Sequence, residues 1–145
     1  MAEEKKYHEN SPAVQAHLNM MQSVIQRMST NSASCKAWCL TLVSAILVII
    51  ADKDKPQYAL IAIIPTVLFL VLDTYYLALE RMLRQTYNIF IDKLHDEKVL
   101  ASDLYALAPT GKLFNTFFSS TLSFSIWPFY VTLLATIWIV KSVLN

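Results

Sequence analysis

One stretch decides the fold of this chain: Phe69-Leu-Val-Leu-Asp-Thr-Tyr-Tyr-Leu-Ala-Leu-Glu-Arg-Met-Leu-Arg-Gln-Thr-Tyr-Asn88. It begins with the apolar residues of a membrane helix and ends with the charged residues of a helix in water, with no Gly or Pro to interrupt it. Asp73 lies in the apolar part, before Glu80 begins the charged part. The distance between them is about 10 Å of helix, so we expect Asp73 below the membrane surface. A carboxylate there costs about 2.5–3.5 kcal/mol and needs a polar partner, a water-filled cavity or a proton.

The composition indicates an all-α integral membrane protein. Of the 145 residues, 55% are hydrophobic and 16% are charged, whereas about 25% are charged in a typical soluble domain. The mean hydropathy is +0.41 and the chain has a single Gly, so helices are favoured. The net charge of +1 selects no partner by itself. Cys35 and Cys39 are too few for a disulfide framework and lack the partner motif of a zinc site.

The hydropathy pattern predicts four segments. Residues 1–34 are expected to form a cytoplasmic amphipathic helix, 35–80 a transmembrane hairpin, 81–112 a cytoplasmic helix and connector, and 113–145 a third transmembrane helix. The small polar residues 29–34 are expected to bend or loosen the chain before the hairpin.

Prolines and polar turns divide the apolar segments further. Pro65 and Pro128 are expected to kink the second and third membrane helices. The polar residues 52–57 are expected to form the tight turn of the hairpin, and the N-terminus lacks the apolar segment of a signal peptide.

Two apolar stripes with heptad-like spacing are expected to pack against each other in the cytoplasm. The first stripe consists of Val14, Leu18, Met21, Ile25 and Met28, and the second of Leu83, Tyr87, Phe90 and Leu94.

Lys and Arg positions predict the orientation. Nine of these residues lie in segments 1–36 and 81–112, and three lie in the hairpin turn and the C-terminal tail. Because cytoplasmic loops carry the excess of Lys and Arg, the N-terminus and the middle segment are expected in the cytoplasm.

Asp73 is the strongest candidate for a functional residue, with two interpretations left open. It is a structural carboxylate that bonds Tyr76, a Ser or Thr of the first membrane helix, or Lys36. Alternatively it lines an aqueous path or pairs with a neighbouring subunit, since ionisable residues inside membranes are usually functional.

Two further sets of residues are candidates. Hydroxyl side chains are expected on one face of the third membrane helix, where they either line a pore between subunits or bond their own backbone: Thr121, Ser125, Thr132 and Thr136. Cations with an interleaved aromatic either bind a phosphate-bearing ligand or form a solvated helix face: Arg81, Arg84, Tyr87, Lys93, His95 and Lys98.

No enzyme signature is present, and the three histidines lack the spacing of metal ligands. We therefore expect a protein that is not an enzyme and has no cofactor and no metal site.

Several motifs are similar to those of a known family. They are Ile25-Gln-Arg-Met28, Ser32-x-x-Cys-Lys-Ala-Trp38, Thr41-Leu-Val43, Tyr58-x-Leu-Ile-Ala-x-x-Pro65, Asp73-x-Tyr-Tyr-Leu-Ala-Leu-Glu-Arg81 and Arg84-x-x-Tyr87. Over residues 14–95 the chain resembles the SLATT-type small membrane effectors of bacterial anti-phage systems, and less closely the membrane effector of Hailong-type systems. Residues 96–145 are not covered by the resemblance.

The resemblance implies a homo-oligomeric channel, a tetramer or another ring, in the bacterial inner membrane. It would depolarise the membrane when it binds a nucleotide or oligonucleotide made by a partner nucleotidyltransferase. The alternative function is a non-conducting membrane anchor or scaffold that recruits a cytoplasmic partner through its heptad helices.

Overall fold

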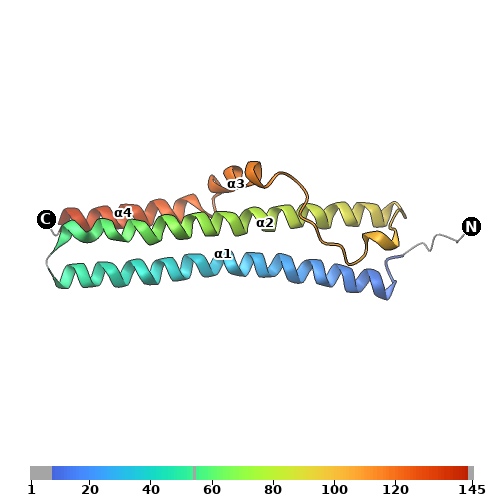
Figure 1. Cartoon of the computed structure of the whole chain (residues 1–145), viewed down its shortest axis with the longest axis horizontal. Coiled ribbons are helices and arrows are strands. Elements are labelled where there is room, and N and C mark those ends of the chain that lie inside the picture. Colours follow the sequence, from blue (N-terminus) through green and yellow to red (C-terminus); the bar gives the residue numbers. More distant parts are fainter. Residues whose placement is uncertain (1–7, 54, 144–145) are drawn as a thin grey trace, which may run out of the picture.

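The computed structural model describes residues 8–53 and 55–143 (Figure 1). Its elements are α1 (Pro12–Asp52), the 3-10 helix η1 (Pro56–Ala62), α2 (Ile63–His95), the 3-10 helix η2 (Ala101–Asp103), α3 (Leu113–Thr121) and α4 (Trp127–Val143). These described residues contain no strand, so the expected all-helical fold is confirmed. Lys5 and Lys6 of the orientation count, Asp54 of the turn and residues 144–145 lie outside the described residues.

Two long helices, α1 and α2, run side by side along the length of the molecule and are joined at one end by η1 (Figure 1). Their 41 and 33 residues correspond to about 60 and 50 Å. The predicted bend at residues 29–34 is wrong, because α1 continues through them without interruption. Serines disturb a helix when their hydroxyls compete for the backbone, and the hydroxyl of Ser32 instead bonds a side chain of α2.

The third apolar segment is two helices and not one. α3 ends at Thr121, a turn follows, and α4 begins at Trp127. Pro128 lies in the first turn of α4, where a proline is favoured, so the predicted kink at Pro128 is wrong. At the hairpin end of the bundle, the chain changes from 3-10 to α geometry at Ile63, just before Pro65.

Each half of the long helices has its own core. At the hairpin end, α4 packs on α1 and η1 around Cys39, Val43, Ala62, Tyr130 and Ile137. At the other end, the two predicted stripes meet, which confirms their pairing. That second core contains Val14, Met21, Phe90 and Leu94, closed by Val99 and Leu104 of the connector after α2.

The outer surfaces of the two halves differ. We call residues 37–72 and 126–143 the apolar section, and residues 12–28 and 80–110 the polar section. Nineteen of the 28 large apolar side chains exposed in the described structure belong to the apolar section, and three belong to the polar section. Two segments, Pro12–Asp52 and Pro56–His95, are long and apolar enough to cross a membrane, whereas α4 is shorter.

Candidate functional site

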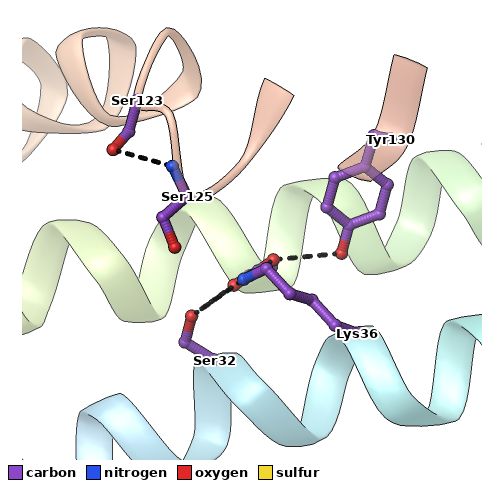
Figure 2. Close-up of polar contacts among 6 residues, drawn as sticks. Ser32, Lys36, Ser123, Ser125 and Tyr130 are labelled. Atoms are coloured by element: carbon purple, nitrogen blue, oxygen red, sulfur yellow. Dashed lines mark hydrogen bonds and ion pairs between the residues drawn. The ribbon is translucent and has the colours of Figure 1, made fainter. Parts of the chain in front are cut away.

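Asp73 is fully buried at the boundary between the apolar and polar sections, where side chains from two other helices surround its carboxylate. Ser32 of α1 donates a hydrogen bond of 2.5 Å to Oδ1, and Tyr130 of α4 donates one of 3.2 Å to Oδ2. The Lys36 ammonium lies 2.6 Å from Oδ2. Figure 2 shows Ser32, Lys36 and Tyr130 converging on this carboxylate. We call these four residues the Asp73 cluster.

Helix geometry explains how the sequence builds this cluster. Ser32 and Lys36 are four residues apart on α1, so both side chains lie on the face that meets α2. The Lys36 ammonium also donates to the Ser32 hydroxyl at 3.4 Å. Tyr130 lies one turn after the start of α4, and its ring is buried. One carboxylate therefore ties together the three helices of the bundle.

The cluster gives the buried Asp73 carboxylate partners within its own chain, which offsets the cost of burying its charge. Lys36 keeps 21% of its side chain exposed, while the Asp73 side chain has none. Removing one partner of such a buried pair typically costs about 3–5 kcal/mol, because the other charge remains buried and unpaired. Within the described chain, the Asp73 carboxylate therefore forms a junction between α1, α2 and α4.

The structure decides among the partners that the sequence left open. Lys36 pairs with Asp73, as one of the alternatives proposed. Ser32 also bonds it, although Ser32 precedes the predicted first membrane helix, and within the described residues Tyr76 makes no hydrogen bond to it. Tyr130 was not anticipated as a partner. The sequence could have indicated it. Tyr130 is the only tyrosine in the charge-free segment 113–140, and buried tyrosine hydroxyls usually have a hydrogen-bond partner.

A further buried hydroxyl belongs to Thr74, which directly follows Asp73 in the sequence. The Thr74 side chain is buried, and its Oγ1 is the one buried side-chain polar atom in the described residues that lacks a hydrogen-bond partner. Such atoms cost about 1–3 kcal/mol. No pattern in the sequence distinguishes Thr74 from the other threonines near the apolar section.

The four hydroxyl residues of the predicted pore face do not form one stripe. Thr121 ends α3 and Ser125 lies in the following turn, so only Thr132 and Thr136 share a helix face. Thr132 donates to the Pro128 carbonyl at 2.7 Å and Thr136 donates to the Thr132 carbonyl at 2.9 Å. Both are exposed and line a groove of about 400 Å³ between α1 and α4.

The predicted cationic site is also divided. Arg84 pairs with Glu80 at 2.9 Å, and Lys98 pairs with Asp96 at 2.7 Å. His95 lies 3.8 Å from Glu9. Each of these groups has its own acidic neighbour, and Arg84 lines a pocket of about 240 Å³ together with Tyr87 of the same predicted set.

Two other members of the cationic set face other elements. Tyr87 accepts a hydrogen bond of 3.2 Å from the Gln22 side chain of α1. Arg81 contacts α3 and the turn after it, where Nη2 donates to Ser123 Oγ at 2.8 Å and Nη1 to Ser120 Oγ at 3.3 Å. The hydrogen bonds of Arg81 thus attach α3 to α2.

Lys93 belongs to a pocket that the sequence did not predict. The pocket measures about 310 Å³ and lies between the long helices and the connector. Lys93 bonds Asp103 at 2.9 Å inside it. Hydrogen bonds from the Leu100 N–H and from Lys93 lower the pKa of Asp103. The lining residues are His17, Met21, Thr86, Ile89, Phe90, Lys93, Ser102, Asp103, Ala106, Ala108 and Thr110.

His17 is the buried histidine of this pocket. Its Nδ1 accepts a hydrogen bond of 3.0 Å from the Tyr105 N–H, and its ring packs edge-on against Phe90 at 4.5 Å. An accepting Nδ1 leaves the proton on Nε2, so the ring is neutral. Burial lowers the pKa of His17, and the charge of Asp103 opposes part of this shift. His17 therefore fastens the connector to α1 only in its neutral form.

No protein-family model, curated protein or solved structure matches this chain. Its function is therefore inferred from its own geometry and from the resemblance of its motifs.

Proposed function

We propose that this protein is a multi-pass membrane effector that assembles into a ring and opens a pore when a ligand binds its polar section. The apolar section supplies the membrane part of the proposal, because its outer surface carries most of the exposed large apolar side chains. Exposed apolar surface of this extent marks a membrane or protein interface. The distribution of Lys and Arg supports an N-terminus in the cytoplasm.

The observation that carries the proposal is the continuity of α1 and α2 across the boundary. Each helix runs without a break from the polar section into the apolar section. The Asp73 cluster lies at the boundary between the two sections and fixes both helices to α4. A shift of α1 against α2 in the polar section would therefore strain this cluster directly. Packed elements with two discrete arrangements can carry such coupling.

The pocket at His17 is the best candidate for receiving a ligand. It lies between α1, α2 and the connector, so an occupant would contact all three elements that could move. Its Lys93 is one of the cations proposed from the sequence, and it is paired with Asp103 as Arg84 is paired with Glu80, but it lines this pocket. That the ligand is a nucleotide or oligonucleotide, and that the output is anti-phage defence in a bacterial inner membrane, is proposed from the SLATT resemblance.

Self-association is required for a pore. Three apolar helices in one chain cannot enclose a channel, and the described interior of the bundle is filled by packed side chains. The groove between α1 and α4 offers hydroxyls from Thr132, Thr136 and Ser44 on an otherwise apolar surface. We propose that this face, repeated around a ring, lines the conducting path.

The scaffold alternative is less well supported. It required the heptad stripes to recruit a partner, and these stripes are buried against each other within the chain. A helix face that is already packed is not free to recruit another helix.

Conductance tests the proposal. Purified protein in planar bilayers of bacterial lipids should carry current, and the current should change when candidate nucleotides are added on the side of the polar section. The Asp73→Asn variant tests the coupling, because it keeps the size of the side chain but removes the charge that holds Lys36. Its current should differ from that of the native protein at equal incorporation. A folded, inserted protein that passes no current under any nucleotide would contradict the proposal.

A further inference from the structure

The helix α3 exposes large apolar side chains and buries a serine, although Asn115 and Ser119 are exposed as well. Four large apolar side chains at or just after α3 are strongly exposed: Phe114 (73%), Phe118 (57%), Leu122 (79%) and Phe124 (84%). The fully buried side chain of α3 is a serine, Ser120. A surface helix of a soluble protein turns its apolar stripe inward. The reversed pattern requires an apolar environment on the outside of α3.

The inward side of α3 is polar because Arg81 lies beneath it. The guanidinium donates to hydroxyls of Ser120 and Ser123 at 3.3 and 2.8 Å, and reaches Ser119 at 3.5 Å. These hydroxyls satisfy a cation next to the apolar section. They also fix the rotation of α3, so that Phe114 and Phe118, one turn apart and packed at 4.8 Å, point away from α2.

The exposed aromatic surface continues along the chain into the apolar section. The turn after α3 carries Phe124, and α4 then exposes Trp127, Val131 and Trp138. No charged residue occurs between Leu113 and Val140. Lys112 directly precedes α3 and is exposed, and a lysine at this place can keep its ammonium at headgroup level while its stem follows the apolar surface.

We infer that α3 is a lipid-contacting helix that lies in the boundary between headgroups and acyl chains, with its phenylalanines in the bilayer and its serines on Arg81. This inference rests on the proposed membrane insertion of the apolar section. The nine residues of α3 are about 13 Å long, too short to cross a hydrocarbon core of about 30 Å. An amphipathic helix of this kind is suited to the interface.

A lipid fits this surface better than a second copy of the chain does. At 150–250 Å² per large side chain, the four exposed groups offer roughly 550 Å² in total. A stable protein interface needs about 800 Å² from each partner. The bilayer needs no such minimum, because lipid already surrounds the adjoining surface of α4 in the proposed membrane state.

Photo-crosslinking of the full-length protein in vesicles of phosphatidylethanolamine and phosphatidylglycerol tests the inference. Phe118 is replaced by p-benzoylphenylalanine, a close match in shape at an exposed position, and the products are weighed as intact protein after irradiation. Trp138 on α4 and Tyr105 on the connector, 67% and 61% exposed, are replaced in the same way as controls for the apolar and polar sections. Phe124 provides a second site if the variant at Phe118 does not fold.

We expect the variants at Phe118 and Trp138 to gain the mass of one phospholipid and the variant at Tyr105 to gain none. A covalent dimer through Phe118 would assign the surface to a second copy and overturn the inference. A lipid adduct at Trp138 without one at Phe118 or Phe124 would also overturn it, while the membrane proposal would stand. If Trp138 gains no lipid either, the proposed insertion of the apolar section itself fails.

Discussion

The polar and apolar sections bury their interiors in similar ways and differ on their outer surfaces. In both, apolar side chains pack between the long helices and the elements that cover them. The polar section then exposes charged residues such as Arg84 and Lys98, while the apolar section exposes residues such as Val48 and Trp138. Interior packing alone therefore does not reveal which solvent surrounds a helix. The outer face does, and the change in outer face along α1 and α2 places the boundary at the Asp73 cluster.

The buried ionisable groups Asp73 and His17 also differ, because one is charged and the other is neutral. Asp73 keeps a cation and two hydroxyl donors around its carboxylate. His17 is buried without a charge, with an N–H donor at Nδ1. The first arrangement stabilises a charged group at the boundary, and the second depends on a group remaining neutral. Substitutions at Lys36, Arg81, His17 and Thr136 each disturb one side of this comparison, with expected effects on stability that decrease in that order.

The largest effect is expected when Lys36 is replaced. In Lys36→Met the Asp73 carboxylate stays buried and loses its cation, so the free energy of unfolding should fall by about 3–5 kcal/mol. Denaturation by SDS titration in mixed micelles measures this change. The double variant Lys36→Met, Asp73→Leu should regain part of the loss, because no buried charge remains, although the hydroxyls of Ser32 and Tyr130 lose their acceptor. A single variant as stable as the native protein would show that the ion pair does not hold the junction.

The next effect concerns the attachment of α3 to α2. Arg81→Ala removes the donor that bonds Ser120 and Ser123, and charged hydrogen bonds are worth about 1.5–3 kcal/mol each. We expect amide hydrogen exchange in α3 to become faster while exchange in α4 is unchanged. The matched control is Arg84→Ala, whose partner is Glu80 one turn away on the same helix. That pair is worth a few tenths of a kcal/mol, so equal effects of the two variants would contradict the assignment of Arg81.

The connector should loosen in mild acid. Because burial depresses the pKa of His17 in the folded protein, its stabilising contribution is complete above the ordinary value of about 6.5 and is lost as the pH falls through the folded pKa. One proton limits the slope to about 1.4 kcal/mol per pH unit. The protection factor for hydrogen exchange of the Tyr105 amide, which donates to His17, should fall over this range.

A His17→Gln variant provides the control for this pH dependence. Its side-chain oxygen can accept the same N–H and does not titrate in this range. The variant should therefore lose this fall in protection. Asp103 cannot be its source, because the pKa of Asp103 is lowered from an ordinary value of 3.8 and its contribution is lost only at lower pH. An unchanged pH profile in the variant would remove His17 as the titrating group.

Much of the fold was predictable because hydropathy periods report on local geometry. The stripes of Val14 and Met21 and of Phe90 and Leu94 predicted a helix pair, and these residues form one core. The unbroken sequence from Phe69 to Asn88 predicted a single helix, and α2 covers it. Spacing within one helix was also informative, since Glu80 and Arg84 lie four residues apart and form an ion pair.

The errors occurred where side chains meet residues distant in sequence. The serines at 29–34 were predicted to loosen α1, but Ser32 bonds Asp73, which lies 41 residues away. Arg81 was considered as a ligand-binding or a solvated residue, and neither interpretation anticipated its bonds to serines about 40 residues later. No Gly marks the break between α3 and α4 in the sequence. Serines at the break bond Arg81 of α2 instead. Such partners depend on the packing of helices and not on local pattern.

The smallest effect on stability is expected at Thr136, and it is the most informative about the pore. The hydroxyl of Thr136 is exposed to the α1–α4 groove and already bonds the Thr132 carbonyl within its own helix. Thr136→Val should therefore change the free energy of unfolding by less than about 0.5 kcal/mol, while it removes a polar group from the proposed conducting face.

Thr41→Val on α1 is the matched control for Thr136. Thr41 is also exposed and bonds the Ala37 carbonyl of its own helix at 2.9 Å, but it does not line that groove. Because the two substitutions remove the same group at the same stability cost, a difference in single-channel conductance reports position alone. Conductance altered by Thr136→Val and not by Thr41→Val would place the α1–α4 face on the ion path. Equal conductance in both variants and the native protein would place that face in lipid or between subunits, and the two sections would then differ only in their solvent.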